Sequence, residues 1–151
     1  MSIRERLSEL GIQVPVATKP VAAYVPASRT GNLIFTSGQL PFVDEQILAV
    51  GKVGRELDIE AAKQLSQVCA LNCLAAVETL VPIEEITRIV RVVGYVNGVA
   101  GFTNHPAVIN GASELFLKLW GENGKHARIA IGVAELPFNA PVEVELIVEC
   151  L

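Results

Sequence analysis

The chain has 151 residues, a formal net charge of −4 and 51% hydrophobic residues against 19% charged ones. This length predicts a single domain over 1–151, with 1–20 as an N-terminal helix and arm, and the apolar content predicts surface buried between subunits. The acidic balance argues against nucleic acid as the main ligand, and Arg88, Arg91 and Gly94 interrupt the longest apolar run, so none can span a bilayer.

The first third of the chain combines helix, arm and hairpin signals. Ser2 is a suitable N-cap and Gly11 a suitable end for a short amphipathic helix, which carries no apolar signal region. We therefore expect a cytoplasmic protein. The predicted elements are a helix over 2–10, an irregular arm over 12–20, and strands over 21–26 and 32–37 joined by turn residues 27–32.

The rest of the chain predicts two long helices and three strands. Asp58 caps a helix that runs to about Leu80, and Asn104 caps a second that runs to about Trp120, with Pro106 in its first turn. The remaining segments are a loop over 42–56, a β-branched central strand over 86–96, a glycine-rich loop over 97–102, and closing strands over 128–133 and 142–149 joined by a proline-containing loop.

The closing strands alternate with period two, which indicates one face in a core and the other against something more polar. Arg128 shares its face only with Ala130 and Gly132, which leaves space around a guanidinium suited to a carboxylate or phosphate. The plainer interpretation is a surface arginine paired with a glutamate.

The three cysteines indicate packing rather than chemistry. Cys69 and Cys73 fall on the apolar stripe of the first long helix, where cysteine acts as a small hydrophobe. No CxxC pair occurs and the two histidines lie far away in sequence, so zinc spacing is absent and we expect no metal site. Cys150 is predicted on the face of the last strand that is poor in apolar residues, as a free thiol.

The order ββ, helix, β, helix, ββ predicts an α+β fold with a mixed sheet and both main helices packed on one face. The other face carries many apolar residues, so we expect subunit association to cover it.

Two motifs in this order resemble the YjgF/RidA family, also called L-PSP endoribonuclease-like. They are Ile34-Phe35-Thr36-Ser37-Gly38-Gln39-Leu40-Pro41 and a closing signature of Ala127-Arg128, Val133-Ala134-Glu135-Leu136-Pro137 and Val142-Glu143-Val144-Glu145. The resemblance implies a chorismate-mutase-like (bacillus type) fold and a homotrimeric barrel of sheets with clefts between subunits. It also implies hydrolysis of reactive enamines and imines, such as 2-aminoacrylate, to 2-keto acids and ammonia without a cofactor.

The resemblance also assigns roles to individual residues. Arg128 matches the family arginine that clamps the substrate carboxylate, and Glu143 the glutamate that holds or activates water. Tyr24 matches a cleft-wall tyrosine, Ser37 and Gly38 the substrate-side loop, and Asn110 an asparagine on the second helix. Each has a plainer interpretation as a solvated strand residue, ordinary packing, a helix-surface polar group or a turn residue.

The chain departs from the family pattern in several places. Ala130 stands where many members have cysteine, Ile129 where serine or threonine is usual, and the segment 94–105 is longer. These departures indicate a divergent subgroup. Two alternatives stay open: a non-catalytic trimer that binds small carboxylates or keto acids, and an endoribonuclease or translation inhibitor, which the charge disfavours.

Overall fold

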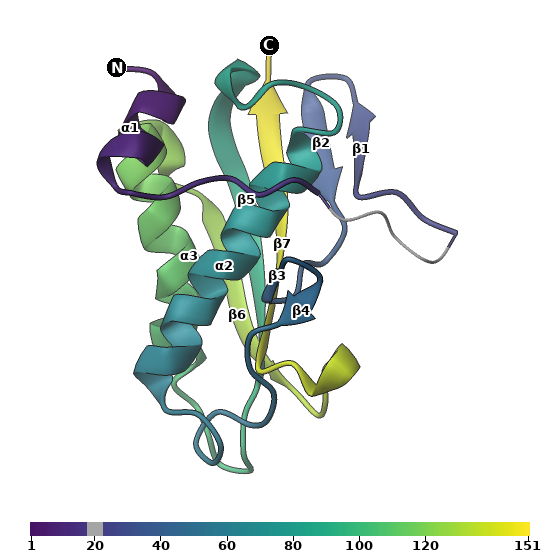
Figure 1. Cartoon of the computed structure of the whole chain (residues 1–151), viewed down its shortest axis with the longest axis vertical. Coiled ribbons are helices and arrows are strands. Elements are labelled where there is room, and N and C mark those ends of the chain that lie inside the picture. The colour runs from purple at the N-terminus through teal and green to yellow at the C-terminus, as the bar shows by residue number, and fades with distance from the viewer. Residues whose placement is uncertain (18–22) are drawn as a thin grey trace.

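A mixed five-stranded sheet forms the back layer of the protein (Figure 1). The computed structural model describes residues 1–17 and 23–151. The strand order is β1-β2-β7-β5-β6, in which β5 and β6 run parallel and all other neighbours antiparallel. The strands are β1 (Ala27–Thr30), β2 (Leu33–Thr36), β5 (Ile86–Asn97), β6 (Ala127–Val133) and β7 (Val142–Cys150), and a separate short hairpin is formed by β3 (Phe42–Val43) and β4 (Gln46–Ile47).

The two long helices, α2 (Ile59–Val77) and α3 (His105–Trp120), lie side by side on one face of this sheet (Figure 1). The Asp58 side chain caps α2 by accepting a hydrogen bond from the Ala61 amide at 2.8 Å. A short helix, α1 (Ile3–Glu9), begins with a capping box between Ser2 and Glu5 and packs beside α3. The described residues also form three 3₁₀ turns, which are η1 (Ile83–Glu85), η2 (Gly121–Gly124) and η3 (Pro137–Asn139). The predicted α+β class and the placement of both helices on one face are confirmed.

Strand register divides the sheet into a helix-facing side and an open side. On β7 every second residue is buried under the helices, beginning with Val142, while the residues between are half-buried. We call the opposite side the open face. The pairings place on it Phe35, Arg91, Val93, Tyr95, Ile129, Ile131, Glu143, Glu145 and Ile147.

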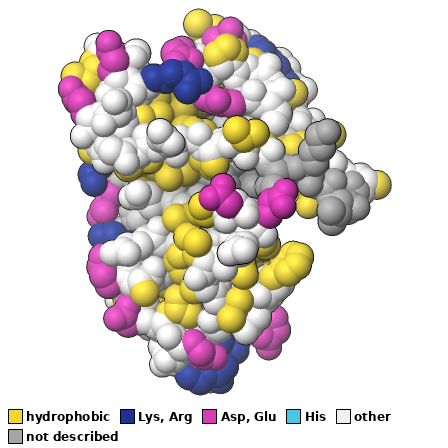
Figure 2. Space-filling model, viewed as in Figure 1, with side chains coloured by type: hydrophobic (Ala, Val, Ile, Leu, Met, Phe, Trp, Pro, Cys, Tyr) yellow, Lys and Arg dark blue, Asp and Glu magenta, His cyan; other side chains and the backbone are white. Residues whose placement is uncertain are grey.

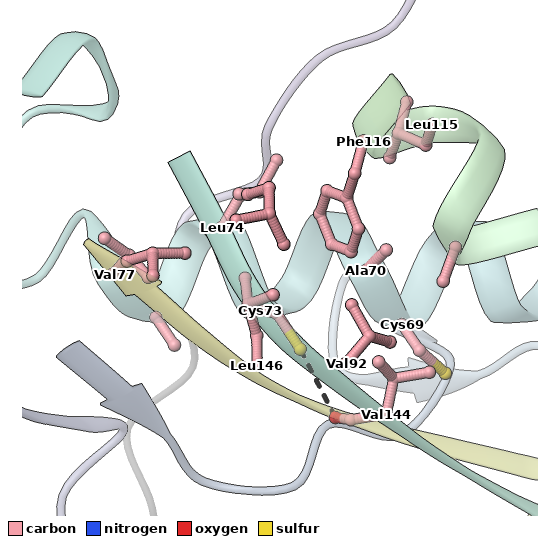
Figure 3. Close-up of a cluster of buried hydrophobic side chains, with 14 of the residues drawn as sticks. Cys69, Ala70, Cys73, Leu74, Val77, Val92, Leu115, Phe116, Val144 and Leu146 are labelled. Carbon is pink, nitrogen blue, oxygen red and sulfur yellow. Dashed lines mark hydrogen bonds between the residues drawn. The ribbon is translucent and has the colours of Figure 1, made fainter. Parts of the chain in front are cut away.

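The core between α2, α3 and the sheet includes two of the cysteines (Figure 3). Cys69 and Cys73 are fully buried, and the Cys73 thiol donates to the Val144 carbonyl at 3.3 Å. Burial raises the pKa of Cys73 to about 12, so its thiol stays protonated. The predicted packing role of these two cysteines is confirmed.

The first hairpin differs from its prediction by a shift along the chain. Ala23–Pro26 forms no strand, and 21–22 lies outside the described residues. Residues 27–30, predicted as part of the turn, form β1 and pair with β2 across a two-residue connection at Gly31 and Asn32. Gly31 has φ of 56°, so the tight turn uses the conformational freedom of glycine at this position.

Three smaller expectations also need correction. Cys150 lies on the helix-facing side and is 2% exposed, because it continues the buried alternation of β7. Asn104 occupies the N-cap position of α3 but makes no capping hydrogen bond with its side chain. The predicted loop over 42–56 contains the β3–β4 hairpin.

In β6 the apolar residues face outward, the reverse of the usual arrangement. Ile129 and Ile131 lie on the open face and are 40% and 43% exposed. Arg128, Ala130 and Gly132 take the helix-facing positions, because they pair with residues of β5 on that side. A Cβ atom added to Gly132 would overlap the His105 ring, so the start of α3 lies close to this edge strand. Within the described residues, no helix is long and apolar enough to cross a membrane.

Candidate functional site

Arg128 lies on edge strand β6 and points toward α3. Its Nη1 atom donates to Asn110 Oδ1 at 2.7 Å and to Ser113 Oγ at 3.2 Å. Asn110 and Ser113 are three residues apart, which puts them on the same side of the helix. Two predicted site residues, Arg128 and Asn110, are therefore in direct contact, and Ser113 is a third member that the sequence reasoning missed.

These contacts leave one edge of the guanidinium available. Both hydrogens on Nη1 are used by α3, whereas Nε and Nη2 have no protein partner among residues 1–17 and 23–151. No aspartate or glutamate of the described chain forms an ion pair with Arg128, so the plainer interpretation of a paired surface arginine is wrong for these residues. The Nε–Nη2 edge has the geometry that binds a carboxylate through two parallel hydrogen bonds.

A histidine extends the network behind Arg128. His126 Nε2 lies 2.8 Å from Ser113 Oγ, and its Nδ1 lies 2.7 Å from the Gly124 carbonyl oxygen. Burial lowers the pKa of His126 below its ordinary value, and the nearby Arg128 charge lowers it further. The hydrogen bond to Gly124 acts in the opposite direction. The i, i+2 spacing of His126 and Arg128 is the one sequence signal that could have linked them.

Glu143 lies on β7, on the open face, beside the loop that follows β2. A Cβ atom added to Gly38 would overlap the Glu143 carboxylate, so the missing side chain makes room for that group. Burial, followed by repulsion from Glu145, raises the pKa of Glu143 above its ordinary value. Glu145 itself accepts a hydrogen bond of 3.1 Å from the Tyr95 hydroxyl.

Ser37 and Tyr24 belong to the same region as Glu143. The Ser37 hydroxyl donates to the Val25 carbonyl at 2.6 Å and so holds the segment containing Tyr24 against the Gly38 loop. Tyr24 is 56% exposed and its side chain faces solvent in the single chain. The Ser37 hydroxyl hydrogen is therefore used by the backbone, while its exposed oxygen can still accept a hydrogen bond.

The predicted residues thus form two groups on opposite sides of the sheet. Arg128 lies in the same row of paired residues across the sheet as Val92 and Leu146, and side chains in one row point to the same face. Val92 and Leu146 face the helices. Glu143 shares its row with Tyr95 and Ile131 on the open face. A single chain therefore does not bring Arg128 and Glu143 together.

The helix side of the molecule carries a hollow beside α1 that neither group lines. Figure 2 shows hydrophobic side chains along the middle of this side and most charged ones toward its margin. A hollow of about 720 Å³ lies between α1 and the arm after it, lined by Arg4, Leu7, Ser8, Gly11, Ile12, Gln13 and Val14. It borders none of the predicted site residues. Nowhere in the described chain do three or more histidine, cysteine, aspartate or glutamate side chains gather as metal ligands.

Comparison with known proteins adds to this geometry. Residues 4–150 match the family model described as "YjgF/chorismate mutase-like, putative endoribonuclease". The chain is 37% identical to Protein TCP17 of Trypanosoma cruzi, covering 97% of this chain and 93% of that protein. It is 30% identical to the 2-iminobutanoate/2-iminopropanoate deaminase of Dermatophagoides farinae, covering 91% of this chain and 93% of that protein.

A solved structure from Agrobacterium tumefaciens, of a protein with unknown function, is 44% identical and superposes with a TM-score of 0.92. The alignment covers 99% of this chain and 92% of that one. The match to the family model and the match to this solved structure both extend over nearly the whole length of the chain. The chain belongs to the YjgF/chorismate-mutase-like family.

Proposed function

We propose that this protein hydrolyses reactive enamine and imine intermediates of the 2-aminoacrylate type to 2-keto acids and ammonia. The observation that carries the proposal is the Arg128 guanidinium, held at Nη1 by α3 and open along its Nε–Nη2 edge. Family membership and the deaminase name of one relative support the reaction class.

The chemistry needs a carboxylate clamp and a base for water. Two hydrogen bonds from Arg128 would fix the carboxylate of the imino acid and orient its C=N carbon. Glu143, whose pKa is raised by burial, would accept a proton from water as the oxygen adds to that carbon. An enamine first tautomerises to the imine. The proton taken from water returns to the nitrogen and completes a carbinolamine. Its C–N bond then breaks as the hydroxyl proton passes to the leaving nitrogen, which gives ammonia and the keto acid with no redox step.

The two groups must then come from different subunits. We propose a homotrimer in which Arg128 and Asn110 of one subunit face Glu143, Gly38 and Tyr24 of the next. The exposed Ile129 and Ile131 on the open face support this association. Molar mass by light scattering tests it: a trimer supports the proposal, and a monomer at micromolar concentration excludes it.

Activity is tested by ammonia and keto-acid release from freshly generated imino acids of different side-chain size. The wild type should be active and the Arg128→Ala variant should lose most of its kcat/KM. Arg88→Ala is the matched control, because Arg88 lies on β5 with a half-exposed side chain near Glu149. Equal activity of the wild type and the Arg128→Ala variant would contradict the assigned clamp.

Mixing experiments test the placement of the site between subunits. Arg128→Ala and Glu143→Ala chains, each inactive alone, should regain activity when refolded together. Random assembly in a cyclic trimer gives about a quarter of the clefts one intact arginine and one intact glutamate. No recovery in mixed trimers would place both residues of a site in one chain.

One observation favours a second function. Because Arg128 and Glu143 lie on opposite faces, the arginine site is complete with Asn110 and Ser113 alone. A trimer that binds small carboxylates or keto acids without turnover would need only this site. Calorimetric binding of pyruvate or 2-ketobutyrate to wild type but not Arg128→Ala, with no hydrolysis of any imine, would favour it.

A further inference from the structure

Behind Arg128, the hydrogen-bond donors and acceptors fix the direction of a chain of contacts. The Gly124 carbonyl can only accept, so His126 Nδ1 carries a hydrogen and donates to it at 2.7 Å. In the neutral ring Nε2 is then the acceptor, and the Ser113 hydroxyl donates to it at 2.8 Å. Arg128 Nη1 can only donate, so Ser113 Oγ accepts from it at 3.2 Å.

This chain joins Gly124 at the end of η2, His126 in the connection between η2 and β6, Ser113 on α3, and Arg128 on β6. Ser113 is only 8% exposed, so its hydroxyl has little access to water and depends on these partners. If His126 were doubly protonated, both ring nitrogens would donate, and the Ser113 hydrogen would lose its acceptor. The neutral ring is therefore the state that satisfies every member.

We propose that Ser113 and His126 are positioning residues, which orient the Arg128 guanidinium for carboxylate binding through this directed hydrogen-bond chain. The inference rests on the proposed function for its kinetic consequence, but the chain itself exists without a substrate. Asn110 fixes one hydrogen of Nη1 and Ser113 the other, so together they define the plane of the guanidinium. Losing Ser113 leaves that plane free to rotate about the contact with Asn110.

Among the described residues, the charged groups near His126 lie on β6 and on the turn that precedes it. On β6 the charged group is Arg128, which adds to the lowering of the imidazole pKa that burial causes. From α3 the ring faces Ser113 and Phe116, the latter edge-on with ring centres 6.1 Å apart. On the preceding η2 turn and its end, Glu122 and Lys125 pair with each other at 3.0 Å.

Kinetics provide the first test. Ser113→Ala should raise KM for an imino acid by about 3- to 30-fold, the effect of one lost hydrogen bond, with kcat within about twofold. His126→Phe should do the same, whereas His126→Gln should stay near wild type because its amide can accept from Ser113 and donate to Gly124. His105→Gln, at the other histidine, is the control. Unchanged KM in both Ser113→Ala and His126→Phe would overturn the proposal.

A ligand-free measurement separates failure of this inference from failure of the proposed function. Nitrogen-detected NMR of the His126 ring should show the Nδ1–H tautomer and a pKa below the ordinary value. Arg128→Met should raise that pKa by removing a nearby positive charge, and Ser113→Ala should shift the Nε2 resonance. An Nε2–H tautomer, or a His126 pKa unaffected by Arg128→Met, would refute the chain whatever the protein hydrolyses.

Discussion

Substituting Gly38 by alanine should reduce activity while leaving stability nearly unchanged. The backbone of Gly38 lies outside the left-handed region, so alanine can adopt its conformation without strain. The added methyl would overlap the Glu143 carboxylate and lie 3.0 Å from its Cδ and 3.4 Å from its Cγ. The overlapped atoms are the far end of a flexible side chain, so Glu143 can turn away.

For Gly38→Ala, the two expected contributions to the free energy of unfolding nearly cancel. Replacing glycine at a compatible position stabilises a protein by about 0.4–1 kcal/mol through the unfolded chain. Forcing Glu143 away from its preferred rotamer costs about 0.5–1.5 kcal/mol. The net change should stay within about 1 kcal/mol, whereas a carboxylate displaced by about 1 Å should lower kcat/KM by about 10- to 100-fold.

Imine hydrolysis and thermal unfolding of the same preparation check this prediction. The matched test is a double-mutant cycle, because Gly38→Ala should have little further effect once Glu143→Ala has removed the displaced group. Full activity in Gly38→Ala would show that the position of the Glu143 carboxylate is irrelevant to turnover. Additive losses in the double mutant would show that Gly38 acts through something else.

Three further predictions concern stability and the thiols. Gly111→Ala should destabilise the fold by about 1–3 kcal/mol despite the higher helix propensity of alanine, because the new methyl would overlap the Lys63 backbone of α2. Thermal denaturation checks this against Lys118→Ala as the control, and equal unfolding midpoints would contradict it. Glu143→Gln should become more stable relative to wild type as pH rises from about 4.5 through the raised Glu143 pKa, because ionisation of the buried carboxylate lowers the free energy of unfolding of the wild type. Urea unfolding at pH 4 and pH 7 measures this difference, and a difference that does not change with pH would refute the prediction. Cys73 should resist thiol reagents in the native protein at pH 8, because it is buried with a pKa of about 12; labelling before unfolding would contradict that burial.

Local sequence signals predicted most elements because their causes are local. Asp58 caps α2 through its own side chain, and the alternation over 142–149 matches β7 because this strand is buried on one side only. The first hairpin was shifted because the apolar run over 21–26 looked more strand-like than Ala27–Thr30. Pairing with β7 through β2 decides that register, and it is a long-range contact.

The sequence predicted several residues of the candidate site, whereas the contacts among them became known only from the three-dimensional structure. Arg128 and Asn110 meet because α3 packs against β6, which no spacing reveals. Ser113 was not predicted as a site residue, because a serine within a helix forms no sequence motif that indicates a function. His126 was considered only as a zinc ligand, since its partners Ser113 and Gly124 become visible only in three dimensions.

The separation of Arg128 from Glu143 follows from the alternation of side chains in the sheet. Paired positions share a face, and Arg128 is in the row of Leu146 whereas Glu143 is in the row of Ile131. No side-chain rotation carries either group through the sheet, so one cleft with both residues needs two copies of the chain. Turnover should therefore depend on assembly, while the arginine site with Asn110 stays intact in each chain. Under the proposed function, dissociation of the subunits should abolish imine hydrolysis, while Arg128 keeps its hydrogen bond to Asn110 within each chain.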